Sequence, residues 1–322
     1  MLLAVAAVIG GFIVLVLGAD RFVEGAAATA SNLGLSPLLI GLVIVGFGTS
    51  APELLVSITA AWQGNPGIAV GNAIGSNIAN IALILGITAV VAPLAVHSRI
   101  VRREIPLLLL ATAGVYLLLR DQLLERIDGS IMLVALCALM GWMVHVALRQ
   151  RDSDALQVEF EQEIRPDMPL GRALLWTLVG LVALLLSSRL LVWGAVVLAQ
   201  RIGVSDLVIG LTVVAVGTSL PELAAALASA RKGEHDIAIG NVIGSNMFNL
   251  LAVLGIPALI APGATPQGVI SRDYPVMAAL TVAMLLMAYG FRGRPGRINR
   301  VEGAILLAAF TGYQAYLYAS HS

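Results

Sequence analysis

A segment of 46 residues occurs twice in this chain, at residues 41–86 and again at residues 210–255. The two copies align without a gap at an offset of 169 residues, and 22 of the 46 positions are identical. Each copy contains one glutamate beside a proline inside an apolar stretch, Glu53 in the first and Glu222 in the second. Repeated apolar segments with interruptions at matching positions are typical of secondary transporters. An ionisable residue within a membrane span is by default a candidate functional residue.

The composition predicts an integral membrane protein. The chain is 59% hydrophobic and 12% charged, whereas soluble domains contain about 25% charged residues. The single cysteine, Cys137, excludes an intrachain disulfide, and no phosphate-binding Gly-Lys-Ser/Thr loop supports ATP-driven transport. No basic patch suggests a nucleic-acid partner, and no nucleophile–base pattern suggests an enzyme. We therefore expect a lipid bilayer as the surroundings, no cofactor, no nucleic acid and no obligate protein partner.

Ten segments are long and apolar enough to be transmembrane helices. They lie near residues 2–30, 37–62, 68–92, 104–120, 129–148, 171–200, 206–230, 237–261, 274–290 and 301–319. We predict a first five-helix repeat at 1–148, a short linker at 149–170 and a second five-helix repeat at 171–322. Because five is odd, the second repeat enters the membrane from the opposite side. The predicted fold class is therefore an all-α membrane protein with ten transmembrane helices in two inverted five-helix repeats.

The distribution of basic residues predicts the orientation in the membrane. Thirteen arginine and lysine residues fall on one side of the predicted spans, and four fall on the other. The positive-inside rule places the richer side in the cytoplasm. Both termini are then extracytoplasmic and the linker 149–170 is cytoplasmic. The linker also carries acidic residues, but it has no EF-hand spacing, so we expect a solvated loop there.

The first motif of each copy predicts a broken helix. Pro52 has no N–H, so the carbonyl of Gly48 loses its helical partner, and Gly46 allows the chain to bend. Backbone groups freed at membrane depth persist only where they line a cavity or bind something. Thr49 and Glu53 are four residues apart and therefore face one side of the helix. The second copy repeats this pattern with Gly217, Thr218, Ser219, Pro221 and Glu222.

The second motif of each copy adds hydroxyl and amide oxygens. Ser76 and Asn80 lie four residues apart on one helix face, with Asn72 one turn earlier. The second copy has Asn241, Ser245 and Asn249 at the same places. Inverted repeats bring their matching motifs together near the bilayer midplane. The predicted pocket contains only hard oxygen donors, which suit Ca²⁺, Na⁺ or Mg²⁺ rather than zinc or copper.

Two carboxylates in one membrane pocket require a counter-charge. A single carboxylate at a helix centre costs about 2.5–3.5 kcal/mol on insertion scales, and two facing acids also repel each other. A bound cation or a proton relieves both costs. In the alternative interpretation, Gly and Pro merely kink the helices and the glutamates pair with arginines. Apart from Arg120 and Arg172 at span ends, Arg21 and Arg189 are the basic residues within predicted spans, and both are away from the motifs, which disfavours that alternative.

The doubled GTSxPE and GNxxGSNxxN motifs resemble the alpha-repeats of the cation/calcium exchanger superfamily, most closely the microbial sodium/calcium exchangers. The resemblance covers the whole chain in span number and symmetry. It implies alternating access, with the long first helix of each half sliding past a fixed core. It also implies that calcium is held by Glu53, Glu222, Thr49 and Thr218. The sodium ligands that it implies are the same glutamates with Ser76, Ser245, Asn80, Ser50, Ser219 and carbonyls such as those of Gly46 and Ala215.

Asn249 differs from several members of this superfamily, including potassium-dependent ones, which have aspartate at this position. Its neutral side chain argues against potassium dependence and leaves the number of sodium ions open. The proton-coupled branch usually has a further glutamate after Gly-Asn, whereas Ala73 follows Gly71 and Asn72 here. We therefore predict Na⁺/Ca²⁺ antiport across the cytoplasmic membrane, with H⁺/Ca²⁺ antiport as the alternative. A passive cation channel is less favoured.

Overall fold

The structure, a computed structural model, describes residues 1–35, 37–64, 66–97, 100–150, 168–201, 215–265, 268–290 and 296–321. The chain forms two compact units. The first contains Met1–Pro52 and Met140–Asn241, and the second contains Glu53–Leu139 and Val242–Ser322. Each unit therefore combines segments from both sequence repeats.

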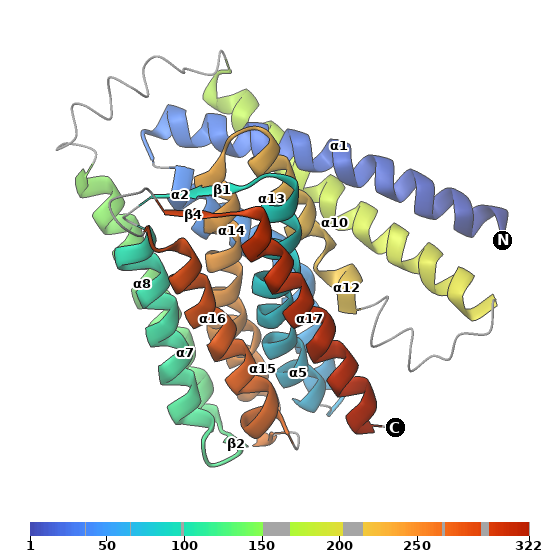
Figure 1. The fold of residues 1–322 in the computed structure, drawn as a ribbon, viewed down its shortest axis with the longest axis vertical. Helices are drawn as coiled ribbons and strands as arrows, with labels where there is room; N and C mark the ends of the chain where they lie inside the picture. The colour runs from blue at the N-terminus through green and yellow to red at the C-terminus, as the bar shows by residue number, and fades with distance from the viewer. Residues whose placement is uncertain are drawn as a thin grey trace. The chain divides into compact units, whose positions relative to one another are not determined.

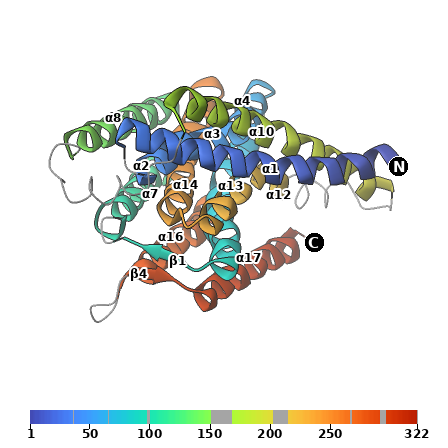
Figure 2. The same ribbon diagram turned by 90° about the horizontal axis from the view of Figure 1, so that it is seen from above.

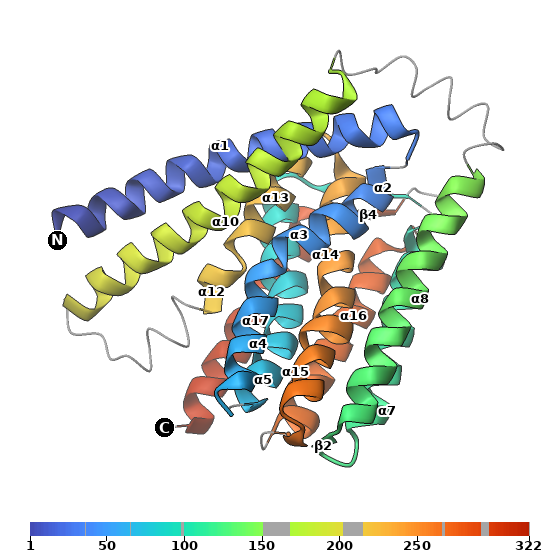
Figure 3. The same cartoon turned by 180° about the vertical axis from the view of Figure 1, so that it is seen from behind.

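Two long antiparallel helices dominate the first unit. Helices α1 (Leu2–Leu33) and α10 (Leu170–Arg201) have 32 residues each and lie side by side in Figures 1 and 3. At 1.5 Å per residue each is about 48 Å long, which exceeds the ~30 Å hydrocarbon core of a bilayer. Glycines bring the two backbones together, because a Cβ atom on Gly25 or Gly180 would collide with the backbone of Thr177 or Phe22.

The first unit also includes short helical segments packed against this pair. They are α2 (Pro37–Ile40), η1 (Gly41–Val45, π-helical), α3 (Gly46–Thr49), α12 (Ala215–Thr218), α13 (Leu220–Arg231) and the first half of α14 (His235–Phe248). Helix α13 contacts both α1 and α3. Phe22, Val45, Leu184 and Ile237 belong to one buried apolar cluster that joins these segments.

The second unit is a bundle of helices interrupted by π-helical segments. From the first repeat it contains most of α4 (Ala51–Trp62), α5 (Pro66–Ile78), η2 (Ala79–Leu85), α6 (Gly86–Val91), η3 (Ile100–Glu104), α7 (Ile105–Leu119) and the start of α8 (Arg126–Gln150). From the second repeat it contains the end of α14, η5 (Asn249–Val253), α15 (Gly255–Ile260), η6 (Val269–Asp273), α16 (Tyr274–Ala288) and α17 (Arg300–His321). Helix α16 contacts α7 and α5, while α17 contacts α6 and η2.

Two short antiparallel strand pairs occur in the second unit, and sequence reasoning missed them because it predicted helices alone. Strand β1 (Leu94–Val96) pairs with β4 (Gly296–Ile298), and both strands are labelled in Figure 2. Leu94 lies opposite Ile298 in this pair. Strand β2 (Leu123–Leu124) pairs with β3 (Gly263–Ala264). These strands follow or precede helix ends, where backbone groups released from the helices need other partners.

Helix occurs in each of the ten predicted spans. Six helices in the described residues are long and apolar enough to cross a membrane, or seven if the bent pair Gly41–Thr49 and Ala51–Trp62 is one span. Helices α7 and α17 lie in two further predicted spans. Residues 206–214 of the remaining predicted span lie outside the described residues, as do 151–167 of the predicted linker. The predicted repeat and linker boundaries stay predictions.

Candidate ion-binding site

Both proline motifs break their helices at the predicted place. Helix α3 ends at Thr49, Ser50 has φ −81° and ψ 6°, and α4 begins at Ala51. The helical segments on the two sides of this break are bent by 48°. In the second copy, α12 ends at Thr218, Ser219 has φ −89° and ψ 5°, and α13 begins at Leu220. The two serines therefore share one sparsely populated backbone conformation, which is common at functional sites.

In the first unit, the hydroxyls of the first copy meet the acid and amide of the second. The Ser50 hydroxyl donates to Glu222 Oε1 at 3.1 Å. The Thr49 hydroxyl donates to Asn241 Oδ1 at 3.1 Å and to the carbonyl of Val45 at 3.0 Å. Glu222 is 2% exposed, and Thr49, Ser50 and Asn241 are buried with it. The residues that meet here are separated by more than 170 positions in sequence and come from both repeats.

One asparagine in each repeat anchors the backbone of the motif glutamate. Asn72 Nδ2 donates to the carbonyl of Glu53 at 2.9 Å, and Asn241 Nδ2 donates to the carbonyl of Glu222 at 3.1 Å. The two bonds are equivalent under the 169-residue offset. Asn72 also donates to the hydroxyl of Ser57 at 2.9 Å. These amide groups therefore fix the helix that carries each glutamate, a positioning role that the spacing of the motif did not predict.

A cluster of buried carboxamides lies in the second unit. Asn80 Nδ2 donates to Asn246 Oδ1 at 3.1 Å, and Asn80, Asn246 and Asn249 are all buried. Asn249 begins the π-helical segment η5, and Asn80 is the second residue of η2; such segments are frequent at functional sites. Among the described residues, Asn80 Oδ1 and both polar side-chain atoms of Asn249 have no hydrogen-bond partner. Leaving such an atom unsatisfied costs about 1–3 kcal/mol, so these oxygens are suited to a ligand.

Sequence reasoning did not single out Asn77 and Asn246. Asn77 is buried, and its Oδ1 has no hydrogen-bond partner among the described residues. Both asparagines follow the serine of the second motif and are identical between the copies. The identity of this Ser-Asn pair in both repeats was the signal that could have found them.

The remaining predicted ligands are placed as follows. Ser76, Ser219 and Ser245 are buried, and Thr218 is partly buried. The Ser219 hydroxyl has no hydrogen-bond partner in the described part of the chain. The carbonyl of Gly46 accepts the N–H of Ser50 at 3.2 Å. Ala215 is the first residue of α12.

The two arginines inside predicted spans lie on the long helices, Arg21 on α1 and Arg189 on α10. Arg21 forms an ion pair with Glu24 at 2.8 Å, and its guanidinium lies 5.0 Å from the centre of the Trp176 ring. Arg189 is exposed on α10. In the described residues, no three His, Cys, Asp or Glu side chains group in a way that could hold a metal ion.

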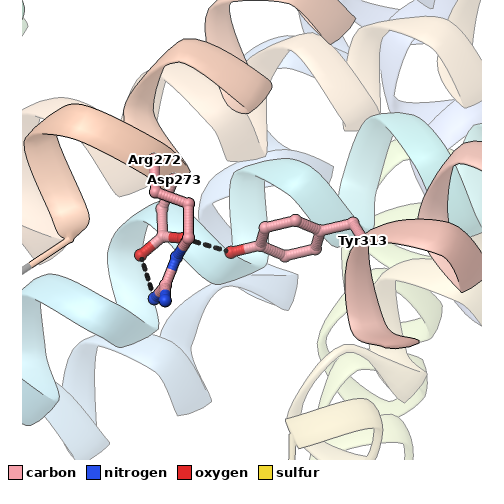
Figure 4. A network of polar contacts seen from close by, with 3 residues as sticks. All are labelled: Arg272, Asp273 and Tyr313. Atoms are coloured by element: carbon pink, nitrogen blue, oxygen red, sulfur yellow. Dashed lines mark hydrogen bonds and ion pairs between the residues drawn. The ribbon is translucent and has the colours of Figure 1, made fainter. Parts of the chain in front are cut away.

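A second pair of buried acids was not predicted. Glu104 is 1% exposed, and its Oε1 lies 3.3 Å from Arg103 Nε. Asp273, which is 169 residues later, accepts from Arg272 Nε at 2.7 Å and from its Nη2 at 3.2 Å. The hydroxyl of Tyr313 on α17 donates to Asp273 Oδ1 at 2.9 Å, as Figure 4 shows. Each acid ends a π-helical segment and has as its partner the guanidinium of the arginine directly before it in sequence.

Comparison with known proteins gives a family and a fold. The family profile described as "Sodium/calcium exchanger protein" matches residues 3–144 and 172–319. CaxA of Alkalimonas amylolytica, for which antiport is a suggested activity, is 51% identical over 99% of this chain and 100% of its own. Inner membrane protein YrbG of Escherichia coli is 42% identical over 99% of this chain and 98% of its own.

A solved structure of the sodium-calcium exchanger NCX_Mj is similar to the whole chain. It has a TM-score of 0.84 and 31% identity, and the match covers 98% of each chain. This match confirms the predicted fold class, a ten-helix membrane protein with two inverted repeats. The resemblance found in the motifs is confirmed by the same comparisons.

Proposed function

Because this chain belongs to the sodium/calcium exchanger family, a family of transporters, we propose that it is a secondary active antiporter that exchanges Na⁺ for Ca²⁺. The observation that carries this proposal is the meeting of Ser50 and Thr49 of the first repeat with Glu222 and Asn241 of the second. A buried carboxylate surrounded by neutral hydroxyl and amide groups is a suitable ligand for a hard cation.

Glu53, Glu222, Thr49 and Thr218 would bind Ca²⁺ in this proposal. Na⁺ would use the same glutamates with Ser50, Ser76, Ser219, Ser245, Asn80, Asn249 and the carbonyls of Gly46 and Ala215. The equivalence of the two repeats supports this ligand set, since both helices break at the same residue and both glutamates have the same asparagine anchor. Two carboxylates balance one Ca²⁺ or two Na⁺. The two ions would compete for the same acids, which makes exchange obligatory.

The energetics of alternating access follow from this competition. A ligand shifts a conformational equilibrium only by as much as its affinity differs between the two states. Sodium bound from outside would move with the site to its inward-open state and leave there along its gradient. Calcium bound from inside would then move with the site back to its outward-open state. The arginine-rich loops would face the cytoplasm, and both termini would be extracytoplasmic.

Calcium flux in proteoliposomes tests the proposal. Calcium uptake should follow an outward sodium gradient and should be lost in the Glu53→Gln variant. The matched control is Glu24→Gln, which removes an exposed acid of α1 that pairs with Arg21 and should leave uptake unchanged. Uptake driven by a pH gradient without sodium would instead establish H⁺/Ca²⁺ antiport. Calcium flux that ignores every counter-ion gradient would establish a channel.

A further inference from the structure

The carboxamide of Asn246 lies against that of Asn80 in the second unit. Asn80 belongs to η2 in the first repeat, and Asn246 lies near the end of α14 in the second. Asn80 Nδ2 donates to Asn246 Oδ1 at 3.1 Å, and each residue is only 1% exposed. Asn80 is one of the proposed ion ligands, whereas Asn246 is not.

This hydrogen bond fixes which atom of Asn80 is available to a ligand. A carboxamide has an oxygen that accepts and a nitrogen that donates, and the two ends are similar in size. Because Nδ2 of Asn80 is bonded to Asn246, its Oδ1 is the remaining atom, and this oxygen has no hydrogen-bond partner among the described residues. Hard cations bind carbonyl oxygens of this kind and do not bind N–H groups. The observed orientation is therefore the one in which Asn80 can bind a cation.

The reverse pairing of the same two amides would block cation binding. Asn246 Nδ2 would then donate to Asn80 Oδ1, and the NH₂ group of Asn80 would occupy the place that its oxygen now has. In the observed pairing, the atom of Asn246 that has no partner in the described part of the chain is Nδ2. Since a donor cannot coordinate a cation, Asn246 is suited to position Asn80 and not to bind the ion itself.

The bond is present in only one of the two equivalent places. The 169-residue offset relates Asn246 to Asn77 and Asn80 to Asn249. The equivalent bond would join Asn249 Nδ2 to Asn77 Oδ1, but within the described ranges neither atom has a partner. Helix α5, which carries Asn77, nevertheless contacts η5, which begins with Asn249. The motif alone therefore does not produce the pairing, and of the two equivalent amides Asn80 is the one held by it.

We propose that Asn246 is a positioning residue that keeps the oxygen of Asn80 turned toward bound Na⁺ and thereby sets the sodium affinity. The inference rests on the proposed function, in which Asn80 binds Na⁺ but is not a Ca²⁺ ligand. Loss of the Asn246 acceptor should therefore weaken sodium binding and leave calcium binding almost unchanged. A residue that only stabilises the fold would not separate the two ions in this way.

Sodium-dependent calcium uptake by the full chain in proteoliposomes tests this proposal. Asn246→Leu removes the acceptor at similar side-chain size, so the internal sodium concentration for half-maximal uptake should rise about tenfold. The external calcium concentration for half-maximal uptake, measured at saturating sodium, should stay within about twofold. Asn246→Asp can only accept when ionised, so its sodium dependence should stay within about threefold of the wild type. Thr281→Val is the matched control, because it removes a buried hydroxyl that donates to the carbonyl of Met277 within α16, and it should change neither concentration.

A second background separates orientation from packing. Asn80→Asp replaces the amide with two equivalent oxygens, so that orientation is no longer needed. Adding Asn246→Leu to Asn80→Asp should raise its sodium requirement by less than about twofold. An equal increase in both backgrounds would overturn the proposal, because it would identify a packing role for Asn246.

The remaining outcomes separate this inference from the proposed function. If Asn246→Leu does not fold, Asn246→Ala is measured in its place, with the same difference expected between sodium and calcium. An unchanged sodium requirement in a folded variant that lacks the acceptor would overturn this inference alone. Wild-type calcium uptake that ignores sodium would overturn the proposed function and this inference with it.

Discussion

The chain contains two pairs of buried acids at the same 169-residue offset, and their surroundings differ. Glu53 and Glu222 lie just after helix breaks, in the first turns of α4 and α13. Glu104 and Asp273 end π-helical segments, each directly after an arginine. Glu222 accepts a hydrogen bond from the neutral Ser50 hydroxyl, whereas Asp273 accepts two from the guanidinium of Arg272. Burial and repetition alone therefore do not distinguish an ion ligand from a structural anchor.

We propose that the hydrogen-bond partner of each acid distinguishes an ion ligand from a structural anchor. A carboxylate with a bidentate arginine has its charge balanced inside the protein. A carboxylate contacted by hydroxyls and held near carboxamides keeps coordination capacity for a cation. Variants that remove one acid of each kind test this distinction when both calcium transport and thermal stability are measured.

Glu222→Gln should have the largest effect on transport. Removing the charge weakens a charge-assisted ligand, so calcium uptake into proteoliposomes should fall by about a hundredfold or more. The thermal stability of the purified protein should be unchanged or higher, because a buried charge is lost. A variant that loses stability in parallel with transport would show that Glu222 is an anchor like Asp273.

Asp273→Asn should show the opposite pattern. It leaves Arg272 with one weaker partner, so the free energy of unfolding should fall by about 2 kcal/mol. Thermal unfolding in detergent measures the loss. Calcium affinity of the folded fraction should stay within about twofold of the wild type. Loss of calcium affinity without loss of stability would place Asp273 in the ion site.

Ser50→Ala should have an intermediate effect confined to transport. It removes the hydroxyl that donates to Glu222 Oε1, and a hydrogen bond to a charged group contributes about 1.5–3 kcal/mol. The sodium and calcium concentrations for half-maximal uptake should therefore rise by about tenfold or more. Ser130→Ala is the control, because that exposed hydroxyl donates to the carbonyl of Arg126 within α8. A larger change in Ser130→Ala would contradict the assignment.

Glu234→Gln should have the smallest effect on stability. Glu234 is an acid of a third kind, outside both buried pairs. It lies in the turn before α14, and burial raises the pKa of its carboxyl, with Asp236 adding to the shift and Lys232 opposing it. The folded state therefore binds a proton at a higher pH than the unfolded state does. This group adds stability as the pH falls through its raised pKa, and that stability is lost as the pH rises. Thermal stability measured against pH should lose this contribution in Glu234→Gln, with a change below about 1 kcal/mol.

Much of the site could be predicted because its signals are local. The breaks at Ser50 and Ser219 follow from Pro52 and Pro221, which lack an N–H whatever surrounds them. The separations of Thr49 from Glu53 and of Ser76 from Asn80 are helical spacings that identify shared faces. The β1–β4 pair was not predictable in this way, since Leu94 and Ile298 are brought together only by the packing of distant helices.

The order of residues by itself determined the repeat, the membrane class, the broken helices and the identity of the motif acids, because each depends on chain-local chemistry or on composition. Tertiary structure decided which group forms a hydrogen bond with each buried amide and carboxylate. Asn241 accepts from Thr49, 192 residues away, while its own amide group anchors Glu222, and Tyr313 reaches Asp273 across 40 residues. The reason is physical: the partner of a buried polar group is chosen by whichever group packing brings within about 3 Å, and spacing along the chain does not specify that neighbour.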